Sequence, residues 1–286
     1  MPTIEQNIKL WSGKHEWSDR GDNWSRHWGG VESEWFGAIF PRIHAFLPTG
    51  TILEIGSGFG RWTQYLKNHA AHLIIVDLVE SCIESCKQRF SSDSHITYHV
   101  NDGQSLAMVP DESIDFVFSF DSLVHVEAKV IEAYLGQLAN KLKRHGVGFI
   151  HHSNIDEYRH LFSLDSKIRG PYKLKKFLRR IGLLEADWWR AHDMSASLFE
   201  RYCEEVGLQC ISQELVNWQG KRLIDAFSLF TRKESMCARP NRIFRNYDFM
   251  EEAKYISYLS PMYVDLLPKT EPSIPSQHEA PTRQDK

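Results

Sequence analysis

The chain lacks several features that would assign it to a special class. No apolar run among its 286 residues reaches the roughly 18 needed to span a bilayer. The first residues, Met1–Gln6, lack the charged and apolar regions of a secretory signal. Cysteines number only five, and an odd count without a signal fits a reducing compartment. These absences predict a soluble protein of the cytoplasm without a transmembrane segment.

A strong excess of charge is also missing. The formal net charge of −3 gives no general reason to expect nucleic-acid binding. Cys82 and Cys86 lie four residues apart, but no second cysteine or histidine pair completes a zinc site. The 42% hydrophobic and 25% charged residues are ordinary for a globular protein, and the length suits one large domain with additions.

The most informative stretch that is present is a glycine-rich turn. Residues 51–60 read TILEIGSGFG, an apolar run followed by alternating glycines, and a helical pattern begins at Arg61. A second apolar run, residues 73–76, ends in Asp77, within the roughly 20-residue spacing at which a carboxylate of a βαβ unit meets a ribose. A carboxylate accepts two hydrogen bonds and therefore suits a ribose diol. The pattern predicts a nucleoside-binding strand–turn–helix unit.

The details of this turn distinguish two cofactors. The NAD fingerprint carries its third glycine where this chain has Arg61. The pattern E-x-G-x-G-x-G, which starts at Glu54, resembles the S-adenosylmethionine (SAM) site of class I methyltransferases. Further matches follow in order at residues 101–103 (NDG) and 113–121 (SIDFVFSFD). The resemblance covers roughly residues 45–155 well and residues 195–233 more loosely.

The resemblance implies a set of cofactor-binding residues. The glycines would form the turn under the methionine part, Asp77 would bind the ribose, and Asp102 would accept from the adenine amino group. Arg61 could reach the carboxylate of the cofactor, or it could be a solvated cation of the first helical turn. A tryptophan-rich arm around Trp28 could close over the cofactor. The full set is Trp28, Glu54, Gly56, Ser57, Gly58, Gly60, Arg61, Asp77, Leu78, Asp102, Gly103, Phe120 and Asp121.

Strands and helices alternate through the middle of the chain, which predicts parallel strands with right-handed crossovers. We expect an α/β fold with a doubly wound, mostly parallel, seven-stranded sheet and a final antiparallel strand. Strands are expected near 51–56, 72–77, 96–100, 114–120, 145–152, 208–217 and 222–232, and helices near 31–47, 60–69, 79–91, 127–143 and 195–206.

The remaining segments divide the chain around this core. We expect an N-terminal aromatic arm and helix (1–50), a SAM-binding core (51–154), an inserted acceptor lid (155–193), the end of the core (194–233), a packed C-terminal segment that is helical over 241–266 (234–267), and a disordered tail (268–286).

Three histidines are candidates for catalysis. His125 follows the fourth strand, in a loop that faces the transferred methyl group in the family, and an imidazole can take a hydroxyl proton near neutral pH. It could instead cap the next helix or pack in the crevice wall. His151 and His152 end the fifth strand, and because successive strand residues point to opposite faces, only one should face the crevice. No HxH or HxxxH spacing occurs among them, so no metal site is predicted.

The acceptor should meet the inserted lid. Residues 166–180 carry many cations and no acid, on an amphipathic helical pattern. They could form a solvated face, attract an anionic acceptor, or bind a membrane surface or nucleic acid. The expected acceptor-binding residues are Asn154, Tyr158, Tyr172, Lys173, Lys176, Arg180, Trp189, Arg190 and His192.

The function predicted from these features is SAM-dependent transfer of a methyl group to an oxygen of a small anionic or sugar-like acceptor. That oxygen could belong to a hydroxyl, a phosphate or phosphonate, or a carboxylate. The arm and the pattern at residues 149–154 resemble small-molecule and sugar methyltransferases of bacterial biosynthetic pathways. The alternative is a nucleic-acid methyltransferase that uses residues 167–180. Against it, residues 120–123 read FDSL, where methyltransferases of base amines resemble one another in a D/N-P-P-Y/F motif.

Overall fold

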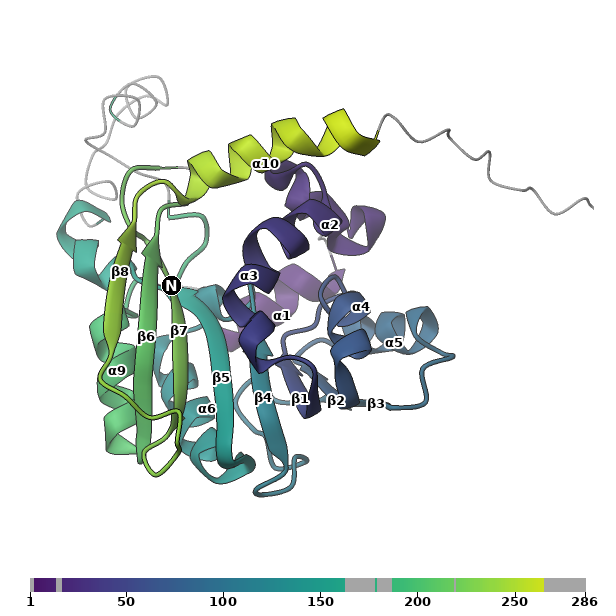
Figure 1. Ribbon diagram of the computed structural model, residues 1–286, viewed down its shortest axis with the longest axis vertical. Helices are drawn as coiled ribbons and strands as arrows, with labels where there is room; N and C mark the ends of the chain where they lie inside the picture. The colour runs from purple at the N-terminus through teal and green to yellow at the C-terminus, as the bar shows by residue number, and fades with distance from the viewer. Residues whose placement is uncertain (1–2, 14–16, 163–177, 179–186, 219, 265–286) are drawn as a thin grey trace, which may run out of the picture.

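A single mixed β-sheet organises the molecule. The computed structural model describes residues 3–13, 17–162, 178, 187–218 and 220–264. The sheet has eight strands in the order β3-β2-β1-β4-β5-β7-β6-β8 (Figure 1). The strands are β1 (Thr49–Ile55), β2 (Ala70–Asp77), β3 (Ile96–Val100), β4 (Ile114–Ser119), β5 (Leu142–Ser153), β6 (Leu208–Val216), β7 (Asp225–Arg232) and β8 (Arg242–Asn246).

Strands β1 to β5 are parallel to their neighbours, and β7 pairs antiparallel with both β5 and β6. This arrangement confirms the predicted α/β fold with its mostly parallel sheet and antiparallel strand. The strand order reverses between β1 and β4, which is the position where doubly wound sheets bind ligands. The prediction of seven strands was wrong by one, because β8 lies in a segment that was predicted to be helical and pairs parallel with β6.

Helices cover both faces of the sheet, so the central strands are apolar on both sides. In β1, Ile52 belongs to one buried cluster and Leu53 to the other. The cluster of Leu53 contains side chains of α6 (Ala128–Lys141) and α9 (Ala196–Glu205), and the cluster of Ile52 contains Trp35 and Ile39 of the N-terminal region. The helices are α2 (Val31–Glu34), η2 (Trp35–Ile39), α3 (Phe40–Ile43), η3 (His44–Phe46), α4 (Thr63–Leu66), η4 (Lys67–His69), α5 (Glu80–Arg89), η5 (Leu123–His125), α6 (Ala128–Lys141), η6 (Ile155–Tyr158) and α9 (Ala196–Glu205).

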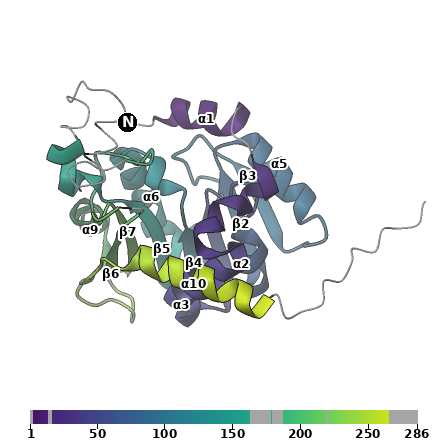
Figure 2. The same cartoon turned by 90° about the horizontal axis from the view of Figure 1, so that it is seen from above.

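The N-terminal arm is more ordered than the sequence predicted. It contains α1 (Ile4–Gly13) and the helical turns η1 (Ser18–Trp28), which are interrupted by left-handed backbone at residues 19–21. Helix α10 (Phe249–Val264) packs against the arm through Phe249, whose ring centroid lies 5.0 Å from that of Trp28. Viewed from above, α1 and α10 lie on opposite sides of the molecule (Figure 2). Among the described residues, no helix is long and apolar enough to cross a membrane.

Candidate active site

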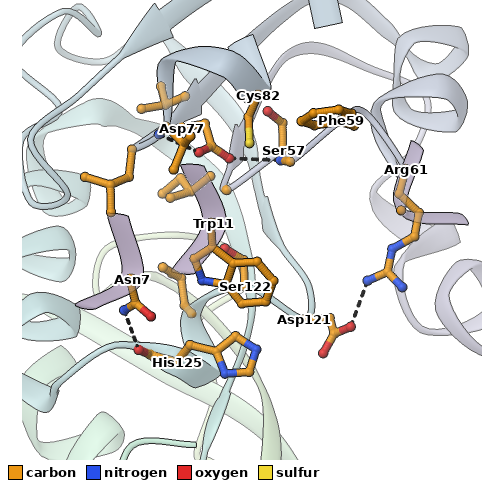
Figure 3. Close-up of a pocket in the computed structure, with 18 of the residues that line it drawn as sticks. Asn7, Trp11, Ser57, Phe59, Arg61, Asp77, Cys82, Asp121, Ser122 and His125 are labelled. Carbon is orange, nitrogen blue, oxygen red and sulfur yellow. Dashed lines mark hydrogen bonds and ion pairs between the residues drawn. The ribbon is translucent and has the colours of Figure 1, made fainter. Parts of the chain in front are cut away.

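One cleft opens at the carboxyl ends of β1, β2 and β4 and is bordered by α1 and η1 (Figure 3). This is the edge at which parallel sheets of this kind bind ligands. Its lining residues are Ile4, Asn7, Trp11, Trp17, Arg20, Gly21, Trp24, Ile55, Gly56, Ser57, Gly58, Phe59, Arg61, Trp62, Val76, Asp77, Leu78, Val79, Cys82, Asn101, Gly103, Phe120, Asp121, Ser122, Leu123, His125, Val126 and Tyr134.

The glycine turn forms the floor of this cleft. A Cβ atom on Gly56 would lie 1.9 Å from Oγ of Ser122, and Gly56 has a positive φ of 77°. The turn therefore contacts the loop after β4 so closely that only glycine fits. Gly60 serves packing instead: a Cβ atom there would lie 2.5 Å from the Phe90 ring, and Gly60 does not line the cleft.

Glu54 does not line the cleft either. Its side chain is buried beneath the turn, where Oε2 accepts a hydrogen bond of 2.6 Å from the Thr63 hydroxyl. Burial raises the pKa of this carboxyl to about 8. The expected cofactor contact of Glu54 is therefore corrected to a contact with the helix that follows the turn.

Asp77 lines the cleft at the end of β2. Its Oδ2 accepts from the backbone N–H of Gly58 at 2.9 Å, and its Oδ1 accepts from the N–H of Val79 at 2.8 Å. Burial raises the pKa of the Asp77 carboxyl, while these backbone hydrogen bonds oppose that shift. Each oxygen retains a further lone pair, so the carboxylate can still accept two ribose hydroxyl groups.

An apolar part of the cleft wall lies beside Asp77, after β2 and β3. A Cβ atom on Gly103 would lie 3.2 Å from Leu78 and 3.3 Å from Ile4 of α1, so these three residues pack closely against one another. Asn101 also lines this region, and its Nδ2 donates to the Tyr134 hydroxyl at 2.9 Å. Asp102 does not line it. Its exposed carboxylate accepts from the N–H groups of Gln104 and Ser105, which lower its pKa, so the predicted adenine contact is corrected.

Arg61 and Asp121 form an ion pair across the cleft, with 2.8 Å between Nη2 and Oδ2 (Figure 3). Burial favours a higher pKa for the Asp121 carboxyl, but the guanidinium groups of Arg61 and Arg190 hold that pKa below its ordinary value. The Arg61 guanidinium also lies over the rings of Trp62, at 4.5 Å, and Trp24, at 5.3 Å. A cation beside an anion is complementary to the zwitterionic amino-acid end of SAM.

His125 also lines the cleft, and one hydrogen bond fixes which of its ring nitrogens carries the proton. Its Nδ1 lies 3.0 Å from the backbone oxygen of Trp189, and since a carbonyl can only accept, Nδ1 carries the proton. Nε2 therefore presents a lone pair. Burial and the nearby Arg190 lower the pKa of His125 to about 4, so the imidazole is neutral at physiological pH.

Three tryptophans of the arm enclose the part of the cleft around His125. Trp11 lies 5.6 Å from the His125 ring and 5.7 Å from Trp24, and Trp17 lies 5.0 Å from Trp24. Trp17 also stacks at 4.3 Å on Phe59 of the glycine turn. Trp28, which was expected here, is instead buried against Phe249 away from the cleft. The arm does close over the cleft, but through other tryptophans.

The two histidines at the end of β5 do not line the cleft. Nδ1 of His151 accepts from the backbone N–H of Asp121 at 3.1 Å, and Nε2 lies 3.3 Å from Oδ2 of Asp225. On the opposite face, His152 stacks on Phe199 at 4.5 Å, and burial lowers its pKa to about 4. Both side chains are fully buried, so direct catalysis by either is corrected to a structural contact.

The residues expected to bind the acceptor are also engaged elsewhere. Asn154 is buried between the Leu223 oxygen and the Ala196 N–H. Arg190 pairs with Asp225 at 2.8 Å. His192 contacts Asp187, Tyr158 packs near Phe162, and Trp189 donates to Asn7, so none of these five lines the cleft. Tyr172, Lys173, Lys176 and Arg180 lie outside the described residues.

Several lining residues were absent from the sequence prediction: Asn7, Trp11, Trp17, Arg20, Trp24, Asn101, Ser122 and Tyr134. The tryptophans could have been found from the composition of the arm and Asn101 from its place after β3. Asn7 carries no comparable signal, because its role depends on where α1 lies.

Comparison with known proteins agrees with this geometry. Residues 52–146 match the family model described as a methyltransferase domain. Phosphoethanolamine N-methyltransferase 1 of Triticum aestivum is 33% identical over 119 residues, which are 40% of this chain and 24% of that protein. Phosphoethanolamine N-methyltransferase 3 of Arabidopsis thaliana is 34% identical over 96 residues, which are 32% of this chain and 20% of that protein. The chain thus spans about a quarter or less of the length of these relatives.

Solved structures share the fold. A SAM-dependent methyltransferase from Methanosarcina mazei superposes with a TM-score of 0.50 at 19% identity, covering 68% of this chain and 97% of that one. A Pyrococcus horikoshii protein gives a TM-score of 0.50 at 16% identity, covering 74% and 99%. The matched residues 52–146 include the glycine turn, so this part of the chain is similar to a methyltransferase domain. These relatives are named phosphoethanolamine N-methyltransferases and not sugar methyltransferases.

Proposed function

We propose that this protein is a SAM-dependent methyltransferase that transfers a methyl group to the nitrogen of a small amine. The observation that carries this proposal is the neutral His125 imidazole, whose Nε2 lone pair is fixed at the aromatic end of the cleft. SAM supplies an electrophilic methyl group on a sulfonium. The protein then needs to hold the lone pair of the acceptor nitrogen in line with that methyl group.

The residues around the cleft support the binding of SAM in one direction. Asp77 would hold the ribose, and the adenine would lie against the apolar wall that contains Leu78 and Gly103. The Arg61–Asp121 pair would meet the carboxylate and ammonium of the methionine part. This orientation brings the sulfonium toward the loop that carries His125.

The weak basicity of His125 favours nitrogen over a hydroxyl oxygen. An alkylammonium such as that of lysine has a pKa of about 10.4, whereas an alkyl hydroxyl resembles water at about 15.7. A neutral imidazole with a pKa of about 4 is too weak to ionise a hydroxyl, but it can orient an amine and accept a hydrogen bond from it.

The tryptophans support a cationic group at the same place. The faces of Trp11 and Trp24 attract ammonium groups and sulfonium alike, since both carry positive charge beside a negative ring face. Two of the relatives with similar cofactor regions are phosphoethanolamine N-methyltransferases by name. A small amine that also bears an anionic group is therefore the acceptor class that we propose.

Methyl transfer to oxygen is the second candidate. Arg20 also lines the cleft, and a cation there would suit a carboxylate or phosphate oxygen, which needs no base. The nucleic-acid alternative depends on residues 167–180, which, apart from Leu178, lie outside the described residues.

Transfer of a labelled methyl group from SAM tests these candidates together. The acceptors are phosphoethanolamine, ethanolamine without the phosphate, matched phosphate esters bearing a hydroxyl or a carboxylate in place of the amine, and an oligonucleotide. We expect label in an amine and a large loss of turnover in His125→Ala. Label only in the hydroxyl or carboxylate compounds would show that the methyl group is transferred to oxygen and not to nitrogen. Label only in the oligonucleotide would overturn the small-molecule proposal.

A further inference from the structure

Asp121 has a backbone conformation that its own residue type does not favour. It follows β4, at the edge of the sheet where the cleft opens, and its φ is 57°. A left-handed conformation is unfavourable for a non-glycine residue, although aspartate tolerates it better than most. Such a conformation persists when neighbouring groups fix it.

His151 is the neighbouring group that contacts this backbone. Its Nδ1 accepts the N–H of Asp121 at 3.1 Å, so the proton of the neutral imidazole is on Nε2. That Nε2 faces Asp225 at 3.3 Å. The ring is also held between Phe120 and Phe227, with centroids 4.8 Å away in both cases, so it has little freedom to turn.

Asp225 and Arg190 complete the buried group. Arg190 donates to both oxygens of Asp225, at 2.8 Å from Nη2 and 3.0 Å from Nε. The side chains of His151, Asp225 and Arg190 are at most 4% exposed. A buried ionised carboxylate beside Nε2 favours the tautomer with its proton there, which leaves Nδ1 as an acceptor for Asp121.

We propose that His151 is a positioning residue, which acts on SAM binding through the backbone of Asp121. By holding that N–H, it directs the Asp121 carboxylate across the cleft to Arg61. The resulting pair is then preorganised for the zwitterionic end of the cofactor. This proposal rests on the proposed function, since it needs SAM in the cleft.

Replacing His151 by asparagine or by glutamine tests its contacts with Asp121 and Asp225 separately, because the two amides reach different distances. In His151→Asn, the amide oxygen can occupy the place of Nδ1 and accept from Asp121. In His151→Gln, the amide reaches further, toward Asp225, and leaves the Asp121 N–H without its acceptor. His152→Asn is the matched control, because it alters the next buried histidine without touching Asp121.

SAM affinity is measured by calorimetry without any acceptor, after thermal unfolding has shown that each variant folds. We expect His151→Gln to weaken SAM binding about fivefold to tenfold, as for one lost hydrogen bond. We expect His151→Asn and His152→Asn to stay within about twofold of wild type. If the glutamine variant does not fold, His151→Ala takes its place.

Two results would overturn the proposal: unchanged affinity in a folded His151→Gln, or an equal loss in His151→Asn. A loss in His152→Asn of the same size would also overturn it, since any buried histidine would then have the same effect. If wild-type protein itself does not bind SAM, the proposed function fails, and that outcome is distinct from the other three.

Discussion

The side-chain amide of Asn7 donates to the backbone oxygen of His125 over 2.8 Å, and this bond attaches the N-terminal helix to the loop that carries His125. The other end of the same side chain accepts from Nε1 of Trp189 at 3.3 Å. Asn7 thus joins three segments that are remote in sequence. Helix α1 closes the cleft through this single buried polar side chain and the apolar contacts of Ile4 and Trp11.

We expect Asn7→Ala to weaken SAM binding about fivefold, because the closed position of α1 loses the hydrogen bond to the His125 oxygen. SAM dissociation should become faster by a similar factor, which stopped-flow tryptophan fluorescence can follow. Ser12→Ala is the control, since Ser12 bonds only to the Ile8 oxygen of its own helix. Equal dissociation rates in both variants would show that α1 does not close the cleft through Asn7.

The Arg61–Asp121 pair should contribute to SAM affinity as one unit. We expect Arg61→Gln and Asp121→Asn each to weaken binding about 10-fold to 100-fold, as for a charge-assisted hydrogen bond. The double variant should lose little more than the worse single one, because each change already breaks the pair. Fully additive losses in calorimetry would contradict a joint role of the two side chains.

His125 should affect turnover and not SAM affinity. We expect His125→Ala to lower kcat by about 10-fold or more, because the amine loses the group that orients it, while the Kd of SAM remains near that of wild type. Because the pKa of His125 is about 4, the imidazole stays neutral from pH 5 upward. The slope of log kcat against pH, which the ionisation of the amine sets, should therefore show no additional break near pH 6.5, and a break there would indicate an ordinary histidine.

Glu54 should make stability depend on pH. Its folded pKa is raised to about 8 from an ordinary 4.5, so its contribution is fully present below pH 4.5 and is lost as pH rises toward 8. We expect Glu54→Gln, whose amide oxygen can still accept from Thr63, to gain on the order of 1–3 kcal/mol over wild type at pH 8. At pH 5 the two should differ little. Chemical denaturation at both pH values measures this, and an equal difference at both would contradict the raised pKa.

The sequence predicted those parts of the fold and the cleft that depend on short-range patterns. The apolar runs of β1 and β2, the glycine turn and Asp77 at the end of its strand are all local, and the structure places them together. Strand β8 was missed because its residues are exposed and its pairing with β6 is set by tertiary contacts. A strand with exposed side chains shows no clear alternation of apolar and polar residues along its sequence.

The site predictions failed where the direction of a side chain decides its role. Asp102 and Asn101 are neighbours, yet Asn101 lines the cleft and Asp102 turns to its own backbone. His151 contacts Asp225 instead of lining the cleft. This contact arises because Asp225 starts antiparallel β7 and so lies at the edge of the sheet where β5 ends. The position of α1, and with it Asn7, follows from packing alone.

Calorimetric titration of the full chain with SAM is the most direct test of the account. We predict saturable binding at one site per chain, weakened about tenfold by Asp77→Asn, which reduces the charge and one acceptor of the ribose contact. The absence of any binding heat at millimolar SAM, in a protein shown to be folded, would contradict the assignment of the cleft.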